Sequence, residues 1–239
     1  MARQRSNTMG LLATRPRAHV SYDIVRGVEE GLCESLGWQR VKPSVRPRQY
    51  FAKAMAAGSM PRLFRSKRSL FMVAMGAYRI ADYAADWRAA TGKKAVWLFD
   101  AWPSSYRYIQ DVTKRYGIDL LFVTAKQSAE RLNRAIDGVD VEWCPEPLVE
   151  MGFKSPPFED RKVGVLQFGR RYDAWHRAVL RSSTPIGARY VYEEAVGHLV
   201  FPTQTDFVLG LADSKISVCF PCDVTNAERA GDVSTMTQR

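Results

Sequence analysis

Residues 163–169 read VGVLQFG, and residues 214–221 read SKISVCFP. Each run is short and largely apolar, ends at a glycine or proline, and leads into a polar, basic segment: RRYDAWHRAVLRSS after the first and CDVTNAERAGDVSTMTQR after the second. A short apolar run bounded by turn residues is typical of a buried strand of a parallel sheet. When a helix follows at once, its first N–H groups and nearby cations face the carboxyl edge of the sheet, where α/β domains bind phosphate groups. These residues predict an α/β domain with an anion site.

The same alternation of strand-like and helix-like segments extends upstream. Apolar runs at residues 10–14, 69–76, 95–102, 118–124 and 139–144 predict five strands before residue 145, and runs at 163–169, 188–194 and 214–221 predict three after it. Between them, residues 77–93 form one candidate helix, in which Ile80, Tyr83, Ala84 and Trp87 share a stripe. Alternating strands and helices favour parallel sheets covered on both faces.

Residues 145–160 interrupt this alternation, because they contain four prolines and show no periodicity. They predict a linker between an N-terminal Rossmann-like domain at 1–144 and a partial domain at 161–239. The second domain is expected to be incomplete, since it has three strands where such domains have about five or six. The predicted fold class is therefore α/β with two Rossmann-like lobes, the second incomplete.

Composition narrows the class of protein. With 46% hydrophobic and 25% charged residues the chain resembles a soluble globular protein, and it lacks the roughly 20-residue apolar run of a membrane span. The first residues lack the apolar core of a signal peptide, so we expect a cytoplasmic protein. Cys219 and Cys222 form a single C-x-x-C pair, and no Asp-x-Asp motif is present. The sequence therefore predicts neither a metal site nor another cofactor.

The net charge of +10 is concentrated in residues 40–68, which contain no acidic residue. Such a block suits an acidic ligand, nucleic acid or an anionic surface, and a solvated loop would look the same. Apolar side chains among the cations favour peripheral contact with an anionic membrane. Motifs of sequence-specific nucleic-acid binding are absent, so no specific nucleic acid is expected. The cations are Arg40, Lys42, Arg46, Arg48, Lys53, Arg62, Arg65, Lys67 and Arg68.

Several of these segments resemble one known family. FGRRYDAWH (168–176), SKISVCFP (214–221) and NAERAG (226–231) look like the donor-binding domain of GT-B glycosyltransferases, family 1-like enzymes akin to the spore-maturation type. Residues 93–102, 117–132 and 143–147 resemble the end of the N-terminal domain and its crossover in the same enzymes. The resemblance covers about residues 93–239. It implies a GT-B fold, an acceptor-side domain at 1–144, a partial nucleotide-sugar-binding domain at 161–239, and hexosyl transfer to a glycan or cell-surface acceptor without a metal.

The resemblance also implies roles in holding the donor diphosphate. Gly169 lets the backbone approach closely, and an arginine after this glycine contacts phosphate in relatives, which points to Arg170 first and Arg171 second. A departing nucleoside diphosphate carries negative charge, and cations and helix N-terminal N–H groups stabilise that charge. An arginine pair at a solvated strand end is the alternative interpretation.

In the NAERAG segment, the resemblance places Glu228 on hydroxyl groups of the donor sugar or ribose, with Arg229 and Gly231 beside the donor. Glu228 also fits a first-turn acid favoured by the helix dipole. The chain departs from the family at Asp232 and Ser234, and the segment that usually follows is missing. The resemblance therefore predicts a C-terminally truncated enzyme, slower than a longer version. An inactive remnant that acts as an interaction module through its basic N-terminal half is the alternative function.

For catalysis, the resemblance implies a base on the acceptor hydroxyl at the first strand–helix turn. His19 occupies that position, and Asp100 ends a predicted strand at the same edge, where it would orient the base or bind sugar. A surface histidine without a catalytic role is the alternative. Aromatic residues near this edge, among them Trp143, are candidates for stacking on a sugar.

Overall fold

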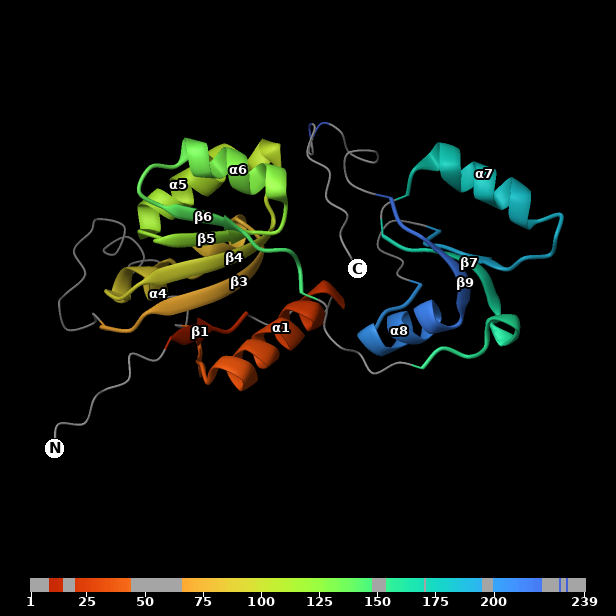
Figure 1. The fold of residues 1–239 in the computed structure, drawn as a ribbon, viewed down its shortest axis with the longest axis horizontal. Helices are drawn as coiled ribbons and strands as arrows, with labels where there is room; N and C mark the ends of the chain where they lie inside the picture. Colours follow the sequence, from red (N-terminus) through yellow and green to blue (C-terminus); the bar gives the residue numbers. More distant parts are fainter. Residues whose placement is uncertain are drawn as a thin grey trace. The chain divides into compact units, whose positions relative to one another are not determined.

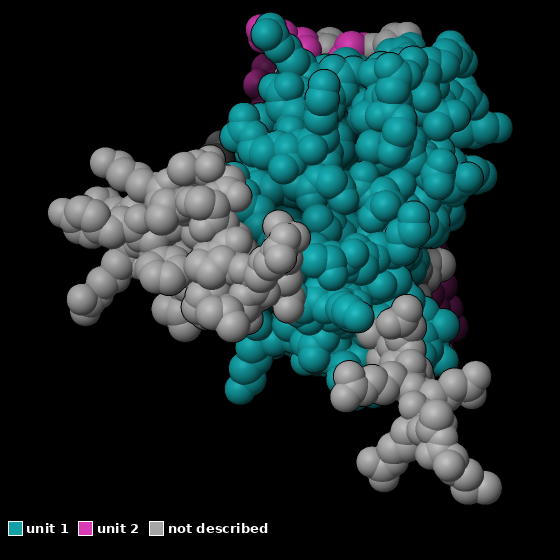
Figure 2. Space-filling view, turned by 90° about the vertical axis from the view of Figure 1, so that its left-hand side faces the viewer, with its two compact units in different colours: residues 1–17, 25–147 teal, residues 18–24, 148–239 magenta. Residues whose placement is uncertain are grey.

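The computed structural model describes residues 9–14, 20–43, 66–147, 154–169, 171–194, 200–220, 228 and 231. The chain divides into two compact units, which Figure 2 colours separately. Unit 1 comprises Met1–Arg17 and Val25–Pro147, and unit 2 comprises Ala18–Ile24 and Leu148–Arg239. The described residues form two separate parallel sheets, one of six strands and one of three, with helices packed on them. The prediction of an α/β protein with Rossmann-like parallel sheets is confirmed.

Unit 1 contains the six-stranded sheet, in the order β2-β1-β3-β4-β5-β6. Every neighbouring pair is parallel. The strand order reverses at β1, as in doubly wound folds whose switch point lies between the first and third strands. The prediction of five strands missed β2, a short, exposed edge strand. The strands are β1 (Gly10–Leu12), β2 (Gln39–Val41), β3 (Leu70–Gly76), β4 (Lys94–Asp100), β5 (Leu120–Val123) and β6 (Asp140–Trp143).

Helices cover both faces of this sheet (Figure 1). Helices α5 (Tyr106–Tyr116) and α6 (Lys126–Ala135) lie on one face, and α1 (Val20–Leu36) lies on the other. A short 3-10 helix, η2 (Pro103–Ser105), leads into α5. Helix α5 buries a stripe of Ile109, Val112 and Tyr116 and ends at Gly117, whose φ of 61° closes the helix in the left-handed region. The central strands are apolar on both faces because each face is covered.

The helix expected over residues 77–93 is interrupted. The structure has α3 (Tyr78–Ala81) and α4 (Ala84–Ala89) with a turn between them. The indole Nε1–H of Trp87 donates to the carbonyl of Ile80 at 3.0 Å, and the backbone N–H of Tyr83 bonds the same oxygen. The Ile80 carbonyl therefore accepts these two bonds in place of the α-helical hydrogen bond from the residue four positions later. The prediction of one helix was wrong, although Ile80, Tyr83 and Trp87 are buried as the stripe required.

A buried carboxylate fastens α1 to the end of β1. Glu29 is 1% exposed, and its Oε1 accepts hydrogen bonds from the backbone N–H of Thr14, at 2.8 Å, and from the Thr14 hydroxyl group. Its Oε2 accepts from Arg40 Nη2 at 3.0 Å, which brings in strand β2. Arg40, the first cation of the basic block, thus forms an ion pair within unit 1. Residues 44–65 of that block lie outside the described residues.

Unit 2 contains the three-stranded parallel sheet, in the order β8-β7-β9. Helix α7 (Asp173–Ser183) lies on one face of the sheet and α8 (Gln204–Ala212) on the other (Figure 1). A 3-10 helix, η3 (Phe158–Asp160), precedes the first strand. Each of the three strands lies within a segment predicted as a strand. The strands are β7 (Val163–Gln167), β8 (Tyr190–Val191) and β9 (Ser214–Val218). No helix in the described part of the chain is both long and apolar enough to cross a membrane.

Candidate functional site

The turn between β7 and α7 forms the carboxyl edge of the unit 2 sheet. Strand β7 ends at Gln167, and Gly169 follows with a φ of 75°, in the left-handed region that favours glycine. Apart from its chain neighbours, no described residue has an atom within 4 Å of where a Cβ on Gly169 would stand, so the described part of the chain leaves this backbone position open. Tyr172 is extended and leads into α7 at Asp173. This is the strand–turn–helix geometry that lets backbone N–H groups meet an anion.

Arg171 lies in this turn and contributes a positive charge to it. Its Nε donates to Asp173 Oδ1 at 2.9 Å, and the side chains are 40% and 62% exposed. An exposed pair of this kind contributes little to stability, about 0–1 kcal/mol. The Asp173 carboxylate also suits the first turn of α7, where the helix dipole favours an anion. A phosphate bound here therefore competes with Asp173 for the guanidinium.

Behind the turn, three polar side chains form a hydrogen-bonded chain, which we call the relay. The Tyr190 hydroxyl donates to Gln167 Oε1 at 2.6 Å, and it lies 2.9 Å from His176 Nδ1. Gln167 is 2% exposed and His176 9%. The ring of Tyr192 packs against His176 with centroids 4.6 Å apart. The relay connects the last residue of β7, the first residue of β8 and the first turns of α7.

Burial controls the ionisation of the relay. Burial, with a smaller contribution from Tyr192, raises the pKa of Tyr190 to about 12, so this hydroxyl keeps its proton at neutral pH. Burial lowers the pKa of His176, and the nearby Arg171 guanidinium lowers it further because the two positive charges repel. His176 is therefore a neutral imidazole at pH 7. A neutral His176 adds no positive charge to that of Arg171.

The end of β9 lies beside the same turn. The ring of Phe220 lies 6.2 Å from that of Tyr172, and the N–H of Phe168 bonds the Val218 carbonyl. The NAERAG segment follows β9 in the chain. Within it, Glu228 is helical and exposed, and Gly231 has a φ of 56°.

Two predicted donor-binding residues, Arg170 and Arg229, lie outside the described residues. Of the predicted donor set, the structure brings Gly169 and Arg171 into one turn. Their grouping with Glu228 and Gly231 stays a prediction.

At the carboxyl edge of the unit 1 sheet, Asp100 is the last residue of β4 and is half-buried, opposite Gly76 of β3. His19 lies outside the described residues, so its pairing with Asp100 stays a prediction. Two further aromatic residues near this edge, Trp97 and Trp102, are buried in the core, which argues against sugar stacking by them. Trp143 is 52% exposed, and its Nε1–H donates to the Thr124 carbonyl at 3.1 Å. Trp143 is thus about half exposed, and the Lys126 ammonium lies over its ring, 5.9 Å from the centroid.

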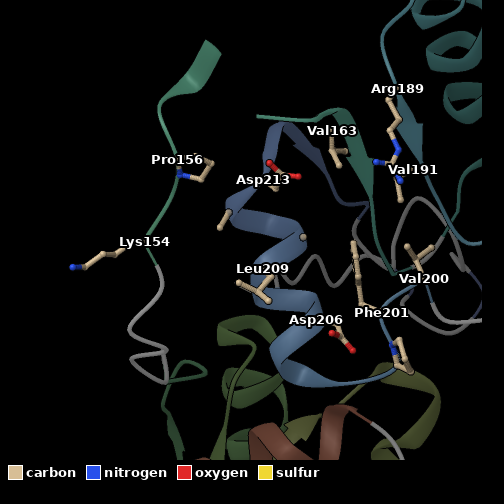
Figure 3. A pocket seen from close by; sticks show the side chains of 13 residues that line it. Lys154, Pro156, Val163, Arg189, Val191, Val200, Phe201, Asp206, Leu209 and Asp213 are labelled. Carbon is tan, nitrogen blue, oxygen red and sulfur yellow. The ribbon is translucent and has the colours of Figure 1, made fainter. Parts of the chain in front are cut away.

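A hollow of about 640 Å³ lies along α8 (Figure 3). Helix α8 covers the face of the unit 2 sheet opposite α7 (Figure 1). The hollow shares no described residue with the β7–α7 turn, and sequence reasoning missed it. The ring of Phe201 lies against Gly210, where a Cβ would stand 2.2 Å from the ring. Lys154 points away from the hollow in Figure 3. The apolar lining of the hollow comes mainly from Pro156, Val163, Val191, Val200, Phe201, Pro202, Leu209 and Ala212.

These features limit the chemistry that the described residues can support. In the described ranges, no group of three His, Cys, Asp or Glu side chains is placed to hold a metal ion. The β7–α7 turn offers a cation, backbone N–H groups and open space, which suits an anion, whereas the α8 hollow is mainly apolar. The chain matches no known family model and no curated protein.

Proposed function

We propose that the protein is a GT-B-type glycosyltransferase that binds the diphosphate of a nucleotide sugar at the β7–α7 turn. The observation that carries the proposal is the juxtaposition of Gly169, whose left-handed backbone faces open space, with the Arg171 guanidinium at the start of α7. This arrangement at the carboxyl edge of a parallel sheet fits a phosphate-bearing ligand better than a neutral one. The resemblance of the 168–176 and 226–231 segments to donor-binding motifs supports the choice of a nucleotide sugar.

In the proposed reaction, the glycosidic bond between sugar and diphosphate breaks and the sugar joins an acceptor hydroxyl. The leaving nucleoside diphosphate gains negative charge, which Arg171 and the N-terminal N–H groups of α7 stabilise without a metal. Arg171 exchanges its bond to Asp173 for bonds to phosphate oxygens. Glu228 accepts hydrogen bonds from hydroxyl groups of the sugar or ribose. His19 takes the acceptor proton, and Asp100 orients that base.

The proposal assigns the acceptor, a glycan or another cell-surface molecule, to unit 1. It also includes a cytoplasmic enzyme that contacts an anionic membrane through the basic block at 40–68. These assignments rest on the resemblance and on charge, so they are tested separately from donor binding.

The direct test incubates the purified chain with a panel of UDP-, GDP-, TDP- and ADP-sugars and measures release of nucleoside diphosphate. We expect saturable binding of one nucleoside diphosphate and slow hydrolysis or transfer of its sugar ester. If no member of the panel binds or reacts, the proposal is wrong and the interaction-module alternative gains support.

A matched pair of variants locates the site. Arg171→Ala removes a cation of the turn, whereas Arg177→Ala removes an exposed cation further along α7. Hydrogen bonds to charged groups are worth about 1.5–3 kcal/mol, so Arg171→Ala should weaken nucleoside diphosphate binding roughly 10- to 150-fold. Arg177→Ala should change it by less than about fivefold, because a screened surface charge contributes under about 1 kcal/mol. Equal losses in both variants would remove the special role of the turn.

A further inference from the structure

The relay spans the turn that holds the proposed donor site. Gln167 is the last residue of β7, immediately before Phe168 and Gly169, and His176 is four residues into α7. Tyr190, from β8, bonds both of them. One hydroxyl group therefore ties together the two ends of the segment that contains Gly169 and Arg171. Within this segment, the exposed Arg171–Asp173 pair adds one more side-chain hydrogen bond.

The hydrogen bonds of the relay have a defined direction. The Tyr190 hydroxyl has one proton, and the amide oxygen of Gln167 accepts it at 2.6 Å. The Tyr190 oxygen must then accept from His176, which requires a proton on Nδ1. The neutral imidazole of His176 is thus held in the Nδ1–H tautomer, with its lone pair on Nε2. The direction of the chain makes Tyr190 the only one of the three groups that both donates and accepts within it.

We propose that Tyr190 is a positioning residue for the donor site: through Gln167 and His176 it fixes the β7–α7 turn in the conformation that presents Gly169 and Arg171 to a diphosphate. This inference rests on the proposed function for its ligand but not for its structural claim. Tyr190 touches no substrate in this account. It acts by holding both anchors of the turn, so that the phosphate-binding groups are ordered before the ligand arrives.

Removing the hydroxyl group tests the claim while the ring stays. Tyr190→Phe removes the hydrogen bonds that connect the buried Gln167 oxygen and the buried His176 ring to β8, which favours local opening of the turn. Tyr192→Phe is the matched control, because its ring packs in the same cluster, 4.7 Å from that of Tyr190, and its hydroxyl makes no described hydrogen bond. Both variants lose one oxygen, so they separate the relay from general packing.

The experiment measures three quantities on ¹⁵N-labelled full-length protein by NMR and calorimetry, well below the unfolding temperature. The first is the tautomer of His176 in the wild-type protein. The second is hydrogen exchange of the Gly169 and Arg171 amides without ligand, and the third is the Kd for UDP and GDP. We expect the Nδ1–H tautomer, at least tenfold faster exchange at both amides in Tyr190→Phe than in Tyr192→Phe, and at least tenfold weaker binding of the preferred nucleotide.

The outcomes separate the two proposals. An Nε2–H tautomer of His176, or unchanged exchange at Gly169 and Arg171 in Tyr190→Phe, overturns the positioning role, whatever binds. Faster exchange at the turn without any loss of affinity also overturns it, since the ordered turn would then be irrelevant to the ligand. If wild-type protein binds neither UDP nor GDP nor any other nucleoside diphosphate, the proposed function fails instead. Should Tyr190→Phe not fold, the tautomer of the wild-type protein still decides the direction of the relay.

Discussion

Replacing Glu29 with alanine should destabilise unit 1 far more than the same substitution at the next residue, Glu30. The Glu29 side chain is 2% exposed and accepts three hydrogen bonds, two from Thr14 and one from Arg40. The change removes the acceptor of the Thr14 N–H and hydroxyl groups, while the 40% exposed Arg40 stays hydrated and beside Glu30. A hydrogen bond to a charged group contributes about 1.5–3 kcal/mol, so we expect the loss of the two from partly buried Thr14 to cost roughly 3–5 kcal/mol.

Glu30→Ala is the matched control. Glu30 is the next residue on α1, its side chain is 53% exposed, and it lies 3.6 Å from the same arginine. Exposed pairs contribute about 0–1 kcal/mol, so this variant should unfold almost as the wild-type protein does. The two variants remove the same chemical group and differ in burial and in hydrogen bonding.

Urea unfolding followed by tryptophan fluorescence measures the difference. Of the six tryptophans, Trp175 alone belongs to unit 2, so the signal reports mainly on unit 1. With a slope of about 2 kcal/mol/M, Glu29→Ala should lower the midpoint by roughly 1.5–2.5 M. A midpoint within about 0.5 M of that of Glu30→Ala would show that the buried carboxylate does not fasten α1 to β1.

Three further predictions concern unit 2. Asp173→Asn removes the carboxylate that competes with a bound phosphate for Arg171. Calorimetry should therefore show that the affinity for a nucleoside diphosphate rises roughly two- to fivefold, and unchanged or weaker binding would contradict the competition. Because folding lowers the pKa of His176 below 6.5, the unfolded chain binds this proton more readily, and unit 2 should lose stability as pH falls below about 6.5. Thermal unfolding from pH 7.5 to 5 should show a flatter profile in His176→Gln, and parallel profiles would refute this. Gly210→Ala places a Cβ against the Phe201 ring and should destabilise unit 2 by about 1–2 kcal/mol, even after the gain in helix propensity. Its control is Gly31→Ala on α1 of unit 1, where a Cβ meets no described atom and should stabilise the helix by about 0.5–1 kcal/mol. Changes of the same sign in the two variants, measured by thermal unfolding, would contradict this packing.

Much of the fold was predictable because its signals are local. The central strands are short apolar runs bounded by turn residues, and a parallel sheet covered on both faces requires such runs. Strand β2 escaped prediction because Gln39-Arg40-Val41 is brief, polar and exposed at the sheet edge, so it has no hydrophobic pattern. The break between α3 and α4 depends on the bond from the Trp87 indole to the Ile80 carbonyl. The spacing of apolar residues does not predict that hydrogen bond, so the break was missed.

The candidate site also contains residues that the sequence pattern indicated and residues that it did not. Gly169 and Arg171 were found because a glycine and basic residues directly after an apolar strand form a local pattern. The relay was not found, since Gln167, His176 and Tyr190 come from three elements and meet through tertiary packing. The one sequence signal was a glutamine at the end of an apolar strand, where a buried amide needs a partner.

The central claim is that the β7–α7 turn is the place where a nucleoside diphosphate binds. An NMR titration of ¹⁵N-labelled protein with the preferred nucleoside diphosphate tests it most directly, because each amide reports its own environment. The account predicts that the largest saturable shift changes occur at Gly169 and Arg171, and that Arg171→Ala needs roughly 10- to 150-fold more ligand to reach saturation. Saturable changes centred instead on Leu209 and Gly210, in the hollow along α8, would contradict it.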